Sequence, residues 1–165
     1  MSGITEVRMG GLEVVAATGG ELKTFVGSCV ALCLFDPVSK VAAMAHIMLP
    51  KKTGGIKPDD NSDLGKYADE AFDIMLHRMT KMGAQQSRIS AKIAGGAAIF
   101  SHESEGAVFN IGSRNLAAIK EILGENNIAI VSEDVGGNFG RWVRFDIVAG
   151  GMTITSSLKK SEKTI

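Results

Sequence analysis

The sequence predicts an α+β domain, and three observations lead to that fold class. Several apolar runs of strand length are bounded by glycine or turn residues, as at 30–35 and 152–158. Two longer segments repeat apolar residues at helical spacing. The chain has 165 residues, of which 45% are hydrophobic and 22% charged, so we expect one globular domain over 1–165. Short strands combined with two helices are typical of the α+β class.

Apolar runs define the predicted strands. They cover 12–18, a stretch that starts at Thr24, and 30–35, 41–49, 88–100, 128–133, 141–148 and 152–158. Between 30–35 and 41–49, Pro37 fixes φ and Asp36 can bond nearby backbone, which predicts a hairpin turn over 36–40. A second hairpin is expected to join the last two runs through Gly150-Gly151.

Two helices are predicted. The first covers 66–82 and ends at Gly83. Its apolar stripe comprises Tyr67, Ala68, Ala71, Phe72, Met75, Leu76 and Met79. The second runs over about 114–123, with Ser113 as N-cap and Gly124 as the stop.

Three polar segments remain between or beyond these elements. The segment 51–65 is the longest predicted loop. The glycine-rich loop 134–141 either borders a substrate groove or is a plain connector. The polar tail from about residue 159 is expected to be frayed.

Charge and hydropathy exclude several classes of protein. The 18 basic and 18 acidic side chains cancel, which argues against a general electrostatic binder of nucleic acid. No apolar run reaches the ~18 residues of a membrane span, so we expect no direct membrane insertion. The N-terminus lacks the apolar region of a signal peptide, which predicts a cytoplasmic protein with free thiols.

Both cysteines and one of the three histidines fall within 18 residues, at Cys29, Cys33 and His46. If the hairpin turn centres on Val38, Cys29 and His46 lie nearly opposite each other. An imidazole there can take the thiol proton and create a nucleophile. Gly27 would let a substrate approach the backbone, and amides around Ser28 could hold an oxyanion. The pair therefore has the parts for acyl transfer.

A structural role is the alternative, because free cysteine is among the most buried residue types. Cys33 shares a strand face with Cys29 but lies four residues away, about 13 Å along a strand. That distance is too long for a disulfide, so we expect Cys33 to be a packing residue. The spacing of Cys29, Cys33 and His46 is not that of a zinc site.

The remaining candidate residues predict neither a metal site nor a cofactor. His77 is expected on the solvated face of the first helix, and His102 in a loop. The cluster Asp59, Asp60 and Asp63 lacks the spacing of a calcium loop. The glycine pairs at 95–96 and 136–137 form no nucleotide-binding fingerprint.

Several motifs, in order along most of the chain, resemble the chemoreceptor glutamine deamidase CheD family. They are VGSCVALCLFDPVSKVAAMAHIMLP, KYADEA, AKIAGGAAIF, NIGSRNLAAIKEIL and EDVGGNFGRWVRFD. The resemblance implies a β-sandwich-like fold of mixed sheets with two main helices packed outside. It also implies a cysteine hydrolase that converts glutamines on cytoplasmic helices of methyl-accepting chemoreceptors to glutamates, and a CheC-type phosphatase partner.

The same resemblance assigns roles to residues. It makes Cys29 the nucleophile and His46 the base. A threonine shortly before the cysteine is the family's third member. Here the candidate is Thr24, five residues before Cys29, whereas Lys23 stands six before. Because a shift of one residue turns a strand side chain to the other face, a backbone carbonyl could orient His46 instead.

Three other functions stay open at this point. A transglutaminase would form the same thioester and pass it to an amine. A non-catalytic regulator would act by binding the phosphatase partner. A redox or metal role would require Cys33 as well as Cys29.

Overall fold

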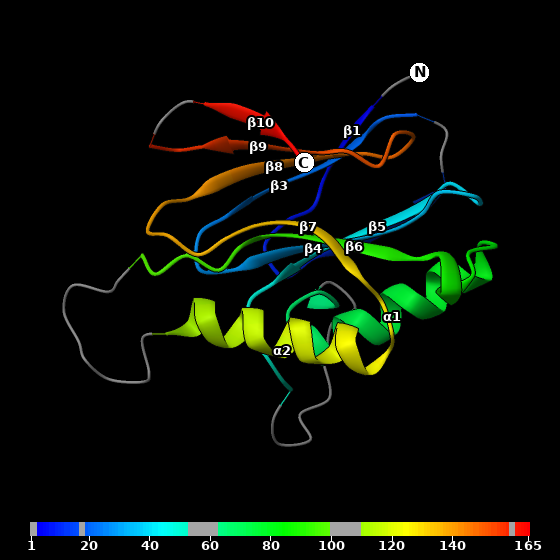
Figure 1. Cartoon of the computed structure of the whole chain (residues 1–165), viewed down its shortest axis with the longest axis horizontal. Helices are drawn as coiled ribbons and strands as arrows, with labels where there is room; N and C mark the ends of the chain where they lie inside the picture. Colours follow the sequence, from blue (N-terminus) through cyan, green and yellow to red (C-terminus); the bar gives the residue numbers. More distant parts are fainter. Residues whose placement is uncertain (1–2, 17–18, 53–62, 100–109, 159–160) are drawn as a thin grey trace.

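Two five-stranded sheets pack face to face, and two helices cover the outer face of the second sheet (Figure 1). The computed structural model describes residues 3–16, 19–52, 63–99, 110–158 and 161–165. Both sheets are mixed, because each contains one parallel pair among antiparallel ones. The predicted α+β class, with sandwiched sheets and outer helices, is confirmed.

The first sheet has the strand order β1-β3-β8-β9-β10. Its strands are β1 (Ile4–Glu6), β3 (Glu21–Val26), β8 (Arg141–Asp146), β9 (Met152–Ser156) and β10 (Glu162–Thr164). The antiparallel hairpin of β8 and β9 confirms the second predicted hairpin.

The second sheet lies in the middle of the molecule and has the order β2-β5-β4-β6-β7 (Figure 1). Its strands are β2 (Leu12–Ala16), β5 (Val41–Ile47), β4 (Val30–Asp36), β6 (Ser90–Gly95) and β7 (Ile130–Val135). The outer layer contains α1 (Ala68–Lys81), a short 3₁₀ helix η2 (Gln86–Arg88) and α2 (Ile111–Glu125). All seven residues of β5 are buried, because one face contacts the first sheet and the other contacts the helices.

The hairpin of β4 and β5 turns where Asp36 predicts it. The carboxylate of Asp36 accepts hydrogen bonds from the N–H groups of Val38 (2.9 Å) and Ser39 (3.3 Å). It also accepts one from Gln85 N–H (2.9 Å) and pairs with Arg88 at 2.8 Å. Burial alone raises the pKa of Asp36, but the bonds from Arg88 and the backbone outweigh it and hold that pKa well below its usual range. The turn is therefore anchored to the segment that follows α1.

The helices correct two predicted boundaries. α1 matches its prediction and is followed by Gly83 at φ +100°. α2 begins three residues before the predicted start, with Asn110 rather than Ser113 at the N-cap. It continues through Gly124, and the left-handed residue beyond its end is Asn127, at φ +55°. Asparagine tolerates this conformation well enough to take the role expected of glycine.

Two edge strands were not predicted, and one of them overturns the prediction of a frayed tail. β1 pairs with β3, and β10 pairs with β9. All residues of both strands are exposed, so neither strand shows the apolar alternation that marks a strand in sequence. Backbone pairing with a formed neighbour, which sequence patterns do not record, orders these segments.

Candidate functional site

Residues 27–29 cross from the first sheet to the second, between the end of β3 and the start of β4. Gly27, Ser28 and Cys29 are each half-buried. Cys29 packs against the core between the sheets, while Cys33, at 1% exposure, lies within that core. The packing position predicted for Cys33 is confirmed.

The strand register corrects the predicted opposition of Cys29 and His46. The residue directly opposite His46 is Ala31, and the last pair of the ladder is Val30 with Ile47. Cys29 is therefore a diagonal neighbour of His46 on the same face of the sheet. The difference arises because the turn spans 37–40 and centres half a residue later than Val38.

A hydrogen bond across the sandwich orients His46. The Oγ1 of Thr24, on β3, lies 2.7 Å from Nδ1 of His46, on β5. The same hydroxyl donates to the carbonyl oxygen of Val7 at 2.7 Å. Because a threonine hydroxyl has a single proton, it must accept from His46 Nδ1–H. The imidazole thus carries its proton on Nδ1 and has its lone pair on Nε2.

The lone-pair nitrogen of His46 is sequestered. His46 is 3% exposed and Thr24 is 2% exposed. Within the described part of the chain, Nε2 is buried and has no hydrogen-bond partner, so the Cys29 thiol does not bond to it in this structure. A buried acceptor without a donor is unfavourable and calls for a functional explanation. A proton-accepting nitrogen beside a thiol supplies one.

Burial keeps both groups neutral. It lowers the pKa of His46 to about 4 and raises the pKa of the Cys29 thiol. Both directions disfavour charge, so at neutral pH the proton stays on sulfur and Nε2 is free to accept it. The arrangement favours proton transfer during attack on a substrate over a standing thiolate–imidazolium pair.

The carbonyl groups of the 27–29 segment are all held by neighbours. Ala97 N–H donates to Gly27 O (2.9 Å), and Gly96 N–H donates to Cys29 O (2.9 Å). The Nδ2 of Asn115, on α2, lies 3.4 Å from Ser28 O. The N–H groups of residues 27–29 donate no hydrogen bond to any other part of the chain that the structure describes. Among the described residues, this segment therefore has N–H groups without acceptors, as an oxyanion site requires.

Two glycines lie at close contacts here, and the contact at Gly95 requires glycine. A Cβ on Gly95 would collide with the carbonyl oxygen of Cys29, and Gly95 has φ +111°. A Cβ on Gly27 would collide with Cδ1 of Ile99. The neighbour that a Cβ on Gly27 would meet is thus a side chain of the protein itself, and substrate approach at Gly27 stays a prediction.

A buried arginine that sequence reasoning missed braces the glycine-rich loop. Arg141 is 1% exposed, and its Nε donates to Asp134 at 2.8 Å. Its Nη2 donates to Gly136 O at 2.8 Å, and Gly137 O accepts from Ala98 N–H at 2.9 Å. The loop thus adjoins the 95–98 segment that holds Cys29. A basic residue directly after a glycine, seven positions after an acidic one, is too common a pattern to predict this contact.

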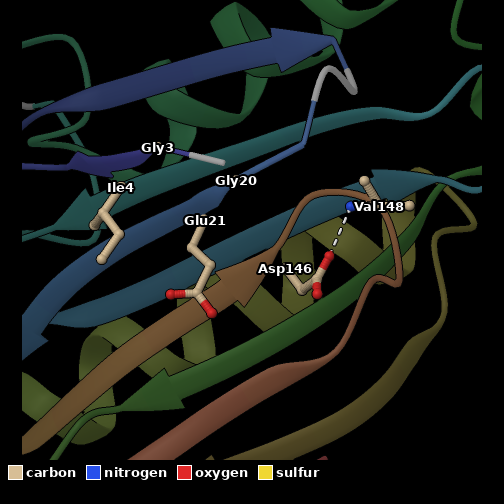
Figure 2. Close-up of a pocket in the computed structure, with 6 residues that line it drawn as sticks. All are labelled: Gly3, Ile4, Gly20, Glu21, Asp146 and Val148. Atoms are coloured by element: carbon tan, nitrogen blue, oxygen red, sulfur yellow. Dashed lines mark hydrogen bonds between the residues drawn. The ribbon is translucent and has the colours of Figure 1, made fainter. Parts of the chain in front are cut away.

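A separate depression of about 390 Å³ lies on the first sheet, and Figure 2 shows the residues that line it. Its two carboxylates are already engaged. Asp146 accepts from Val148 N–H at 2.8 Å, and Glu21 lies 3.7 Å from Arg144. None of Thr24, Cys29 or His46 lines it. These side chains stabilise a turn and a strand pair and supply no nucleophile.

The other candidates add no chemistry. No group of three His, Cys, Asp or Glu residues in the described ranges could hold a metal ion. His77 is exposed on α1, as expected, and Asp63 is an exposed residue 3.9 Å from Arg8. His102, Asp59 and Asp60 lie outside the described residues. The described helices include none that is both long and apolar enough to cross a membrane.

Comparisons with known proteins agree with the motifs of the chain. The family model described as CheD chemotactic sensory transduction matches residues 48–156. A protein of Desulfitobacterium hafniense, named probable chemoreceptor glutamine deamidase CheD, is 38% identical over 165 residues, which is 100% of both chains. A protein of Thermotoga maritima, named chemoreceptor glutamine deamidase CheD, is 47% identical over 129 residues, 78% of this chain and 76% of that protein.

A further relative, from Halalkalibacterium halodurans, has the same name and is 42% identical over 146 residues, 88% of this chain and 89% of that protein. The family model covers most of the chain, and these identities extend over most of its length. The match to the family model begins after Thr24, Cys29 and His46, so these three residues take no part in that match. The chain therefore belongs to the CheD family.

Proposed function

We propose that the protein is a chemotaxis protein-glutamine deamidase that hydrolyses selected glutamine side chains of methyl-accepting chemoreceptors to glutamate and ammonia. The names of its relatives support the reaction and the substrate class. The observation that carries the proposal is the 2.7 Å bond between Thr24 and His46. It leaves Nε2 of His46 buried on the face shared with Cys29, with no partner among the described residues.

In the first half-reaction, His46 Nε2 accepts the thiol proton as Cys29 Sγ attacks the carbonyl carbon of the glutamine side chain. The Thr24 hydroxyl stabilises the imidazolium through Nδ1–H. The N–H groups along Gly27, Ser28 and Cys29, which have no acceptor among the described residues, donate to the oxyanion. The C–N bond then breaks as the imidazolium proton passes to nitrogen, which releases ammonia and leaves a thioester.

In the second half-reaction, water attacks the thioester carbonyl while His46 accepts a proton from that water. The C–S bond breaks, and the proton returns to the sulfur of Cys29. The products are a glutamate side chain and the original thiol. The cycle requires no metal or cofactor, because a thiol, an imidazole and backbone donors supply every proton and charge contact.

The cytoplasmic helices of chemoreceptors are the proposed substrate, which agrees with a cytoplasmic location. A CheC-type phosphatase is the proposed regulatory partner and follows from the family resemblance. A purely regulatory role through that partner is the second candidate. The buried Thr24–His46 pair favours catalysis, since a side chain this deeply buried cannot contribute to a surface that binds a partner protein.

Replacing Cys29 tests the proposal. We expect Cys29→Ala to lower kcat for ammonia release from purified receptor cytoplasmic fragments by at least about a thousandfold, because the nucleophile is gone. Mass spectrometry of receptor peptides measures the conversion of glutamine to glutamate. Cys33→Ser is the matched control and should retain activity if it folds. Full ammonia release by Cys29→Ala would refute the mechanism.

A labelled primary amine in the same assay separates hydrolysis from transamidation. A deamidase gives glutamate with no incorporated label, whereas a transglutaminase attaches the amine to the receptor. Retention of chemotactic signalling by Cys29→Ala, together with loss of deamidation, would favour the regulatory alternative.

A further inference from the structure

We propose that Asn115 is a positioning residue that aims the oxyanion donors of the active site. The inference rests on the proposed function, because it takes Cys29 as the nucleophile. Asn115 lies on α2 and is fully buried, at 0% exposure. Its Nδ2 donates to two carbonyl oxygens, Ser28 O at 3.4 Å and Met48 O at 3.1 Å. One side chain thus connects the segment of Cys29 to the strand of His46.

Asn115 acts where the β4–β5 ladder ends. The last ladder pair is Val30 with Ile47, so the next residues outward are Cys29 and Met48. Beyond that pair the strands separate, because the N–H groups of Met48 and Leu49 both donate to Lys66 O. The carbonyls of Ser28 and Met48 are left without partners from each other's strand. The carboxamide of Asn115 supplies a donor to both.

Because the peptide bond is planar, the hydrogen bond from Asn115 to Ser28 O also orients the N–H of Cys29. The carbonyl of Ser28 and the N–H of Cys29 belong to one rigid, trans peptide unit, and they point in opposite directions. A donor that holds Ser28 O therefore also sets the direction of Cys29 N–H. The bond from Ala97 to Gly27 O sets the direction of Ser28 N–H in the same way. These two amides are among the donors that the mechanism assigns to the oxyanion.

Close helix packing fixes the depth at which Asn115 enters the site. A Cβ on Gly112 would lie 2.6 Å from Gly96 O and 2.7 Å from Ala97 O, so α2 touches the backbone of the 96–97 segment. Within the described part of the chain, Oδ1 of Asn115 is buried and has no partner. An apolar residue of similar size would avoid that unfavourable burial. The presence of a carboxamide at position 115 is therefore explained by the hydrogen bonds from Nδ2 to Ser28 O and Met48 O.

The test uses the full chain and receptor cytoplasmic fragments as substrate. Asn115→Leu removes both donors at similar volume. We expect kcat to fall about a hundredfold, the scale of losing or misaligning one oxyanion donor, while KM stays within about threefold. The rate is expressed per folded molecule, measured by circular dichroism. Should this variant not fold, Asn115→Ala repeats the measurement without added bulk.

A pH profile separates positioning from mere packing. In Asn115→Asp, the protonated carboxyl can donate to one of the two carbonyls, whereas the ionised form repels both. We expect the activity of this variant relative to the unmodified protein to rise as pH falls from 8 to 6. The corresponding ratio for Asn115→Leu should stay flat.

Asn126 provides the matched control. Its Nδ2 donates to Ile122 O at 2.8 Å at the end of the same helix, and it contacts neither Ser28 nor Met48. Asn126→Leu should lower thermal stability without changing kcat. A kcat for Asn115→Leu within threefold of the unmodified protein, or flat pH ratios for both Asn115 variants, would overturn the inference. If Cys29→Ala is inactive, such a result contradicts the role of Asn115 alone; an active Cys29→Ala contradicts the proposed function.

Discussion

Thr24 and His46 belong to different sheets, so the orientation of the imidazole depends on the distance between two layers. Thr24 Oγ1 accepts from Nδ1–H only because its own proton goes to Val7 O, a backbone group at the start of the chain. Three separate segments therefore determine one histidine tautomer. At the scale of residues, the tautomer of the base thus depends on a relay of two hydrogen bonds, from His46 to Thr24 and from Thr24 to Val7 O.

Thr24→Val tests this relay. Valine keeps the shape of threonine but cannot accept the Nδ1–H bond, so the imidazolium loses its stabilising partner. We expect kcat to fall by about a hundredfold, within the usual range for a misoriented acid–base group. Steady-state measurement of ammonia release checks it. Thr24→Ser retains the hydroxyl and should restore most of the activity; equal losses in both variants would contradict the relay.

At the scale of elements, the β4–β5 hairpin carries His46 and adjoins Cys29, and its turn is anchored by the buried carboxylate of Asp36. Arg88, which is partly exposed, neutralises that carboxylate at 2.8 Å. The anchor joins the hairpin to the segment after α1. The position of the hairpin thus depends on an ion pair far from the chemistry.

Arg88→Ala should lower the free energy of unfolding, because it leaves the buried carboxylate of Asp36 without its cation. Removing one partner of a buried pair typically destabilises by about 3 kcal/mol, since the remaining charge is uncompensated. Urea unfolding at neutral pH measures the loss, and we expect it to shrink in acid as Asp36 protonates. Lys120→Ala is the control, because Lys120 pairs with Glu133 at 3.2 Å on the surface. We expect this substitution to lower the free energy of unfolding by less than about 1 kcal/mol. Equal effects from both substitutions would contradict the assignment.

At the scale of the whole molecule, burial of a neutral imidazole links folding to pH. The pKa of His46 is about 4 in the folded chain, below its ordinary 6.5. Between about pH 6.5 and 4 the unfolded chain therefore binds a proton on His46 that the folded chain does not bind. The free energy of unfolding falls as the pH drops through this range. The lowered pKa values of Asp36 and Asp134 add their own losses at still lower pH.

His46→Gln should flatten the stability profile in that window. The free energy of unfolding of the unmodified protein is expected to fall by up to about 3 kcal/mol between pH 6.5 and 4, at about 1.4 kcal/mol per pH unit. Urea midpoints measured across this range provide the check. Parallel profiles for the variant and the unmodified protein would show that another group is responsible.

Sequence patterns predicted the central elements well and the edges poorly. α1 buries one apolar face, which leaves a helical period in the sequence, and the central strands β4 and β5 are buried on both faces, which leaves continuous apolar runs. β1 and β10 are short and fully exposed, so they leave no such trace. The hairpin was expected from Asp36-Pro37, but its register differed enough to move Cys29 from opposite His46 to a diagonal position.

By itself, the sequence determined the α+β class, the hairpin and the placement of Cys29 and His46 on one strand face, because side-chain periodicity and turn chemistry are local properties. The family motifs added Thr24 as a candidate. Only the tertiary structure decided that Thr24 reaches His46, that Asn115 holds Ser28 and that Arg141 is buried. Each of these contacts joins segments far apart in the chain, and their geometry depends on how layers pack, which no local pattern encodes.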